Sequence, residues 1–297
     1  MRQQCRKIAV IGLVSLLGTG ALFAQKRYKR PDNRLEKQHE IMLYFGGGLS
    51  TLKYKVTAGK QTDGFGGHIG VGYNFFFSPG LALGTGVEFS LFTASFALDN
   101  TGTRFMTTDI ENSLFEFRST MENYKESQNV VMVHIPLMVQ IQIGKKHQFY
   151  VAAGGKVGLP IRARYDNSAT IIQNSGYYEK EDYEYTTQLF MGFGRFTGNS
   201  GSLNFKMSFL ASAEIGVRWV MKDGYAFYTG IYCDYGLNNI VKQETNSQQF
   251  IDFNQAHPSD FTVNSIITSQ YYQDNDMQSF TNRIIPLTGG IKLRLAF

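Results

Sequence analysis

The sequence predicts an all-β fold, a transmembrane antiparallel up-and-down β-barrel of eight strands. Three observations lead to this prediction. Apolar and polar residues alternate along many segments, the connections between these segments alternate between short and long, and aromatic residues gather beside the short connections. A membrane barrel explains all three, because each strand presents one face to lipid and the other to the lumen.

The first 24 residues have the layout of a cleavable secretory signal peptide. A positively charged start, with Arg2, Arg6 and Lys7, precedes an apolar stretch that ends at Ala24. This stretch is shorter than the roughly 20 residues that a membrane-spanning helix needs. We therefore expect export across the inner membrane and location in the outer membrane. The predicted domains are a signal peptide at 1–24, a short basic periplasmic stub at 25–39 and a barrel domain at 40–297.

Charge and cysteine content argue against several classes of protein. The chain has 29 basic and 24 acidic residues, but the signal peptide holds three of the basic ones and none of the acidic ones. The remaining balance, about +2, gives no basic surface typical of nucleic-acid binding. Cys233 is the one cysteine after the signal peptide, which excludes a disulfide framework and a cysteine-based metal site. We expect no cofactor.

Period-two alternation predicts the eight strands. It is clearest at 131–143, where every second residue is apolar and His134, Gln140 and Gln142 lie between. Strands of 10–18 residues are long for a soluble sheet but suit a tilted membrane crossing. The other predicted outward series are Ile41–Leu49, Phe65–Phe77, Leu81–Leu91, Phe149–Ile161, Phe205–Trp219, Tyr225–Leu237 and Ile285–Phe297.

The connections predict the orientation. Three are tight, at 77–80, 144–148 and 221–224, and three are expected to be long polar loops, at 97–126, 165–201 and 239–281. Outer-membrane barrels have short periplasmic turns and long external loops. Eight strands place both chain ends on the periplasmic side. A ten-stranded barrel is the alternative, although 97–126 could instead extend two existing strands as a hairpin above the membrane.

Apolar-face aromatics near the short turns predict an interfacial girdle on the periplasmic side. They are Tyr73, Phe75, Phe77, Phe149, Trp219, Tyr225 and Phe227. The chain also ends in an alternating strand that closes on an aromatic residue. This pattern resembles the terminal signal read by the barrel assembly machinery, with Gly290, Leu293, Leu295 and Phe297 as its residues.

Several motifs resemble the PorT-like, OmpA-like family of outer-membrane β-barrels. They are His134–Met138, Ala152–Gly158 and Tyr232–Asn239. The resemblance covers 40–297. It implies the barrel fold and, through its PorT-like members, a role in a secretion or assembly complex, but barrels of one fold serve many functions.

The inward face of the strands predicts a charged lumen. An eight-stranded barrel is filled by side chains, so an open pore is not expected. Buried charges must be paired, and Glu88 and Glu214 should each form an ion pair with a neighbouring basic group. The predicted interior ion-pair cluster is Glu88, Glu214, Asp234, Lys156, Arg218, Lys292 and Arg294.

We expect no enzymatic activity. The glycine runs open no helix, and Val157 follows Lys156 where a phosphate-binding loop needs Ser or Thr. The inward-facing His68 and His134 suggest an outer-membrane hydrolase, but no spacing selects one Ser–His–acid set. Glu88 and Glu214 lie too deep in a filled lumen to hydrolyse a sugar.

The long loops carry the predicted functional surface. Aromatic residues mixed with amides, as in 165–201 and 239–281, are typical of protein or glycan binding. The sequence therefore favours a membrane scaffold whose loops serve binding, adhesion or envelope integrity. The alternatives are a variable exterior without a fixed ligand, a component of a secretion or assembly complex, and an outer-membrane hydrolase. Expected partners are outer-membrane lipid and the assembly machinery.

Overall fold

The computed structural model describes residues 38–145, 147–186, 194–196, 198–221, 224–242, 248–253, 261–273 and 276–297. The predicted signal peptide, 1–24, lies outside the described residues, and so does the predicted stub up to residue 37. In the described ranges, no helix has the length and apolar character needed to cross a membrane.

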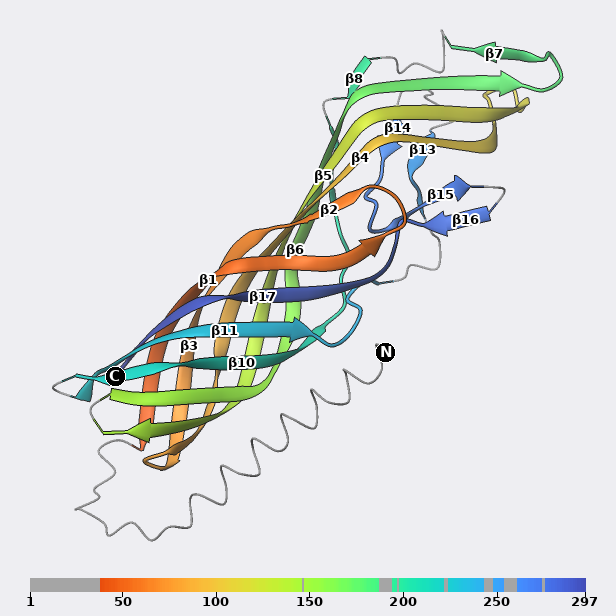
Figure 1. Ribbon diagram of the computed structural model, residues 1–297. Helices are drawn as coiled ribbons and strands as arrows, with labels where there is room; N and C mark the ends of the chain where they lie inside the picture. The colour runs from red at the N-terminus through yellow and green to blue at the C-terminus, as the bar shows by residue number, and fades with distance from the viewer. Residues whose placement is uncertain are drawn as a thin grey trace, which may run out of the picture. The chain divides into compact units, whose positions relative to one another are not determined.

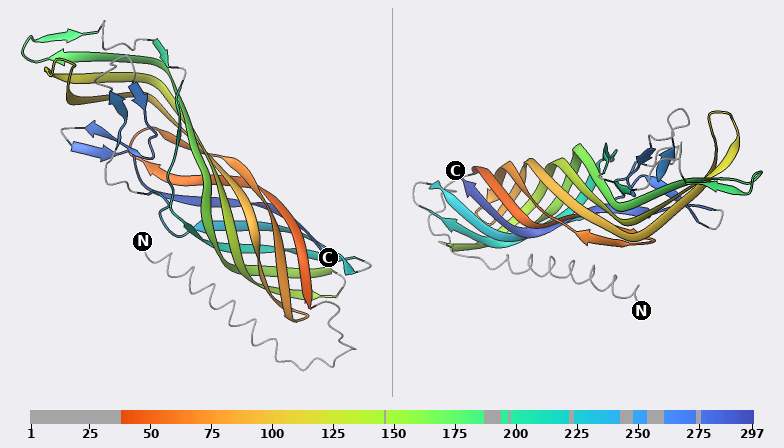
Figure 2. Two further views of the ribbon diagram at one scale, coloured as in Figure 1. Left: turned by 180° about the vertical axis from the view of Figure 1, so that it is seen from behind. Right: turned by 90° about the horizontal axis from the view of Figure 1, so that it is seen from above.

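Eight long antiparallel strands close into a ring among the described residues (Figure 1; Figure 2). The order is β10-β11-β17-β1-β3-β4-β5-β6, and pairing of β6 with β10 completes it. This agrees with the all-β antiparallel prediction. The strands are β1 His39–Val56, β3 Phe65–Ser78, β4 Leu81–Thr108, β5 Leu114–Gly144, β6 His147–Tyr178, β10 Ser208–Val220, β11 Ala226–Gly236 and β17 Thr281–Ala296.

The outer face of the ring is an apolar band, because side chains alternate between the two faces of a strand. On β5, for example, Ile135, Leu137, Val139, Ile141 and Ile143 are all exposed. Such a surface would be costly in water and is expected in lipid. The expected outward series is wrong at two of its members: Ile285 is 8% exposed, and Phe205 is partly buried against the core described below.

Three strands continue far beyond this band. Residues 97–126 do not form a loop but the hairpin given as the alternative, because β4 and β5 stay paired as far as Thr108 opposite Leu114. These residues lengthen two strands of the ring and add none. The expected loop at 165–201 is also wrong in part, since Tyr165–Tyr178 continues β6. Short strands pair with β6 there: β7 Tyr183–Tyr185, β8 Gly194–Phe196 and β9 Ser200–Ser202.

We call the extension the part of β4, β5 and β6 beyond the apolar band, which includes 97–126 and Tyr165–Tyr178, together with the chain segments that pack on it. The strand β2, Lys60–Asp63, pairs with β4 at its base. The segment expected as the loop 239–281 carries several short strands within its described residues, so that expectation is wrong in part as well. They are β12 Gln248–Gln249, β13 Ile251–Phe253, β14 Phe261–Val263, β15 Ser269–Gln273 and β16 Asp276–Ser279.

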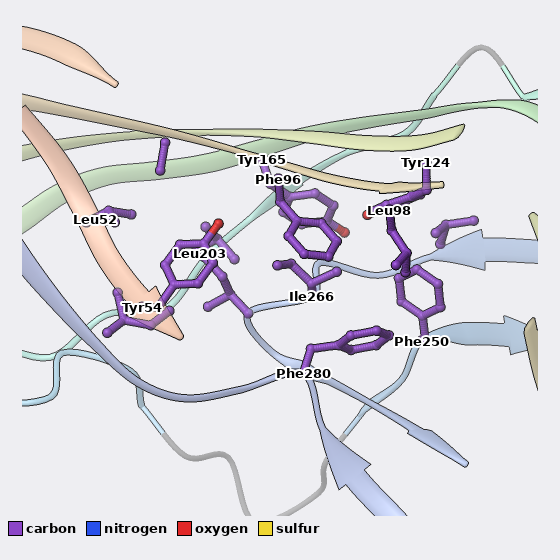
Figure 3. Packing of buried hydrophobic residues seen from close by; sticks show 14 of the residues in the cluster. Leu52, Tyr54, Phe96, Leu98, Tyr124, Tyr165, Leu203, Phe250, Ile266 and Phe280 are labelled. Atoms are coloured by element: carbon purple, nitrogen blue, oxygen red, sulfur yellow. The ribbon is translucent and has the colours of Figure 1, made fainter. Parts of the chain in front are cut away.

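A hydrophobic core holds the extension together (Figure 3). Side chains from the inner face of the β4–β5–β6 sheet meet those from the segment before β17. Phe250 lies between Tyr124 and Phe280, with ring centroids 5.3 Å and 5.0 Å away. Phe250 and Phe280 are 1% and 2% exposed. These aromatics, expected on a binding surface, therefore stabilise the extension from within.

Candidate functional site

The lumen of the barrel contains a network of buried ion pairs. Lys156 on β6 donates to Glu88 on β4, with Nζ 2.9 Å and 3.1 Å from the two carboxylate oxygens. It also lies 2.9 Å from Asp234 Oδ2 on β11. Ser212 donates a further hydrogen bond to Asp234. One ammonium group thus joins carboxylates from two strands that are not neighbours in the ring.

The second half of the network surrounds Glu214 on β10. Its carboxylate contacts Arg294 and lies 3.4 Å from Lys292 Nζ, while Tyr150 donates a hydrogen bond of 2.6 Å. Lys292 Nζ also lies 3.9 Å from Glu88, which connects the two halves. The structure therefore brings together six residues of the predicted cluster: Glu88, Glu214, Asp234, Lys156, Lys292 and Arg294.

The seventh predicted member, Arg218, does not join this group. It pairs with Glu40 on β1 at 2.8 Å and also donates to Gln148 and Tyr228. Tyr228 donates to the same Glu40 at 2.6 Å. Sequence reasoning missed Glu40, although it precedes the buried Met42 and Tyr44 in the inward series of β1.

Two glycines make room for bulky neighbours in the lumen. A Cβ atom on Gly46 would lie 2.5 Å from His68 Cε1, and one on Gly70 would lie 2.7 Å from the Tyr44 ring. Larger residues there would displace these side chains. The glycine runs therefore serve packing.

The inward histidines do not form a Ser–His–acid arrangement. Ser90 Oγ lies 3.0 Å from His134 Nδ1, but the nearby carboxylate of Glu88 accepts from Ser90 itself, also at 3.0 Å. In a catalytic triad the acid orients the imidazole. A cavity of about 40 Å³ lies among Tyr44, Lys156, Glu214, Lys292 and Arg294. It has room for water and not for a sugar.

The predicted periplasmic girdle lies on the outer face beside the short turns. Tyr73, Phe77, Phe149, Trp219 and Tyr225 are exposed, and the remaining two predicted members, Phe75 and Phe227, are half-buried on the same face. Trp219 Nε1 donates to Thr229, and the Phe75 and Phe77 rings are 5.0 Å apart.

The predicted C-terminal signal lies on β17 and on Phe297, the residue that follows it. Leu295 and Phe297 point outward, with 41% and 40% exposure, and Leu293 is half-buried on the same face. Phe297 exchanges two backbone hydrogen bonds with Ile41 of β1. A Cβ atom on Gly290 would lie 2.0 Å from the Gly47 carbonyl oxygen. The last residue of the chain is thus part of the seam between the last and the first strand of the ring.

The outer end of the extension carries two exposed aromatic side chains on one face of the sheet, which we call the tip. Tyr183 and Tyr185 of β7 are 58% and 37% exposed. Their rings are 4.7 Å apart, and Tyr185 lies 5.5 Å from Tyr178, which stacks on Phe115. The tip consists of Tyr183 and Tyr185, whereas Met106 and Leu114 are exposed on the opposite face of the sheet.

Hydrogen bonds hold Tyr185 and its neighbour Tyr178 in place. Tyr185 donates to Glu181, and Tyr178 donates to Asp109 in the turn between β4 and β5. Arg118 stacks 4.3 Å from the Tyr177 ring centroid and is paired with Glu116. Of the other aromatics expected on the loop surface, Tyr165 is buried and Phe261 is half-buried. The side chains of Phe253, Tyr271 and Tyr272 lie outside the described residues.

Comparison with known proteins identifies the family. A family model for the outer membrane protein beta-barrel domain matches residues 23–242. Among solved structures, the chain is similar to the translocator domain of the autotransporter NalP from Neisseria meningitidis, with 7% sequence identity, coverage of 97% of both chains and a TM-score of 0.21. No curated protein matches. Because the family model spans most of the chain, the protein belongs to the outer membrane protein β-barrel domain family and is an outer-membrane β-barrel protein.

Proposed function

We propose that this protein is a non-enzymatic outer-membrane scaffold that holds an external binding surface, the tip, away from the membrane. In this proposal a signal peptide directs export across the inner membrane and is cleaved after Ala24. The observation that carries the proposal is the ordered aromatic group on a paired β-sheet with its own hydrophobic core. The lumen contributes stability, because its charged groups are paired with one another.

The chemistry of the tip suits binding of a protein or glycan surface. Tyrosine offers a large contact area with few rotatable bonds, and rings that are already fixed lose little entropy when a ligand binds. Tyr183 and Tyr185, the first and last residues of β7, combine this with exposed side chains. Such a surface supports adhesion or recognition at the cell exterior.

A direct test uses cells that display the full-length protein. Adhesion to arrays of immobilised glycans and extracellular-matrix proteins is compared between the wild type and the double variant Tyr183→Ser, Tyr185→Ser. We expect retention on at least one surface to fall about tenfold or more, since aromatic hot spots dominate binding energy. Lys125→Ala, an exposed substitution on β5, is the control. Equal adhesion of wild type and double variant at equal surface abundance would contradict the proposal.

The PorT-like resemblance supports a second candidate, a barrel component of a secretion or assembly complex. The motifs His134–Met138, Ala152–Gly158 and Tyr232–Asn239 carry this resemblance. Extraction in mild detergent followed by co-purification distinguishes the two functions. A stoichiometric membrane partner favours the complex, whereas a protein that is isolated alone and still binds through the tip favours the scaffold.

A further inference from the structure

The apolar band ends abruptly at its upper edge. On β4 the outward residue changes from Leu91 to Thr93, and on β5 from Val131 to Asn129. On β6 the change is from Ile161 to Arg162, both of them exposed. This edge marks the level at which acyl chains give way to lipid headgroups. The exposed apolar side chains below it are favourable only in contact with hydrocarbon.

A basic group lies immediately above that edge on β6 and on the chain that leads into β10. A bulge in the β5–β6 pairing lies here: Val131 pairs with Arg162, and Met132 pairs with Pro160. As a result, Arg162 and Arg164 are both exposed, and they are roughly 7 Å apart along one face of the strand. Lys206, also exposed, follows the segment that runs beside them, where Ser202 pairs with Arg164.

These three cations have no acidic partner within the described part of the chain. Some basic groups elsewhere on the exterior are paired, since Lys53 lies 3.0 Å from Asp63 and Arg118 lies 3.3 Å from Glu184. The nearest carboxylate along β6, Asp166, accepts instead from the Ser200 hydroxyl at 2.6 Å. An excess of positive charge therefore remains beside the apolar edge.

Directly below the basic group is a surface that fits acyl chains. Phe209 pairs with Val157 across β10 and β6, and both are exposed. Leu159 and Met207 extend this surface toward the edge, with exposures of 45% and 48%. A cationic group above an apolar strip matches a lipid with an anionic headgroup.

We propose that Arg162, Arg164 and Lys206 form a binding site for the phosphate groups of an outer-leaflet lipid whose acyl chains lie on Val157, Leu159, Met207 and Phe209. The planar guanidinium groups can each donate two hydrogen bonds to a phosphate, and the flexible lysine adds a third charge. The long stems of these side chains lie along the apolar surface and leave the charged ends at headgroup level.

The test measures equilibrium binding of lipid A, a phosphorylated glucosamine lipid, to the purified full-length protein in uncharged detergent. Dephosphorylated lipid A keeps the acyl chains and isolates the contribution of phosphate. The variant is Arg162→Gln, Arg164→Gln, Lys206→Gln, and the control is Lys125→Gln, which removes an exposed charge higher on β5. We expect the triple variant to bind about a hundredfold more weakly at low salt, since each basic group near an anionic lipid contributes severalfold.

The remaining outcomes are equally informative. The site is supported if the wild type binds dephosphorylated lipid A more weakly than lipid A, and if the triple variant binds the two lipids equally. Equal affinity for both lipids, or an unchanged triple variant, overturns it. Complete competition by inorganic phosphate at the concentration of the lipid also overturns it, because the ligand would then be free phosphate. Heat-modifiable mobility on gels verifies that every variant is folded.

Discussion

The barrel and the extension share three strands, β4, β5 and β6, but have opposite interiors. In the barrel, the lumen holds Glu88, Lys156 and Glu214, and the outside is apolar. In the extension, the interior holds Phe96 and Phe250, and the outside is polar except at its outer end. The strand β4 passes through both without a break. The solvent on each side, lipid or water, therefore decides which face is apolar.

The change occurs within a few residues of β4. Its inward face runs from Glu88 and Ser90 to Phe92, Ala94 and Phe96, while its outward face changes from apolar to hydroxyl side chains. Charges in the lumen need partners because they have left water. Apolar residues in the extension gain by leaving water. Each prediction below tests one side of this difference.

The largest effect is expected in the lumen. Lys156→Met removes the cation shared by Glu88 and Asp234 and leaves two buried carboxylates without it. We expect the whole barrel to lose about 5 kcal/mol of unfolding free energy. Denaturant titration in lipid vesicles, followed by the fluorescence of Trp219, measures this loss. Lys125→Met, an exposed substitution, should change stability by less than about 0.5 kcal/mol.

A double variant sharpens this test. The double variant carries both Lys156→Met and Glu88→Gln. If it is more stable than Lys156→Met alone, the loss of stability arises from the carboxylate that has no cation. No recovery would mean that packing of the lysine stem, rather than charge pairing, dominates at this position.

A smaller and local effect is expected in the extension. Phe250→Ala leaves a cavity between Tyr124 and Phe280, which costs about 3 kcal/mol. Because the ring of strands does not depend on Phe250, this loss should appear as faster amide exchange in 261–273 and not in β10 or β11. The lipid-facing truncation Phe89→Ala should leave exchange in the extension unchanged. Global unfolding by Phe250→Ala would show that the two regions are one cooperative unit.

The sequence predicts the barrel better than the extension, for a physical reason. Strict alternation identifies lipid-facing positions such as Leu137 and Val139, and their neighbours then face the lumen. Pairing across the lumen depends on the stagger of the strands, so Glu40 as partner of Arg218 could not be deduced. A signal for the extension was present: after Leu91 the apolar series continues at even positions, as Phe92, Ala94 and Phe96. This reversal without a turn marks a strand that leaves the membrane.

Glu126 is an exception to the apolar interior of the extension, because its carboxyl group is buried there. It accepts hydrogen bonds from Tyr124, Gln128, Ser265 and the backbone N–H of Ile266, at 2.6–3.0 Å. No basic group forms an ion pair with it among the described residues. Burial without a cation raises the pKa of the Glu126 carboxyl above its usual range.

The sign of the pH effect follows from this shift. Glu126 binds a proton more readily when the segment 261–273 is packed against β5 than when this segment has opened. The packing of this segment is the stability that changes with pH. Its stability is therefore greatest below the ordinary pKa of glutamate and decreases as the pH rises through the raised value. We expect the amide of Ile266 to exchange faster at pH 8 than at pH 5, after correction for intrinsic rates. The change should be smaller than that of Phe250→Ala, because all the hydrogen-bonding groups remain. Glu126→Gln cannot titrate and should remove the pH dependence. If the Ile266 amide instead became better protected from exchange as the pH rises, the four hydrogen-bond donors to Glu126 would outweigh the cost of burying its charge.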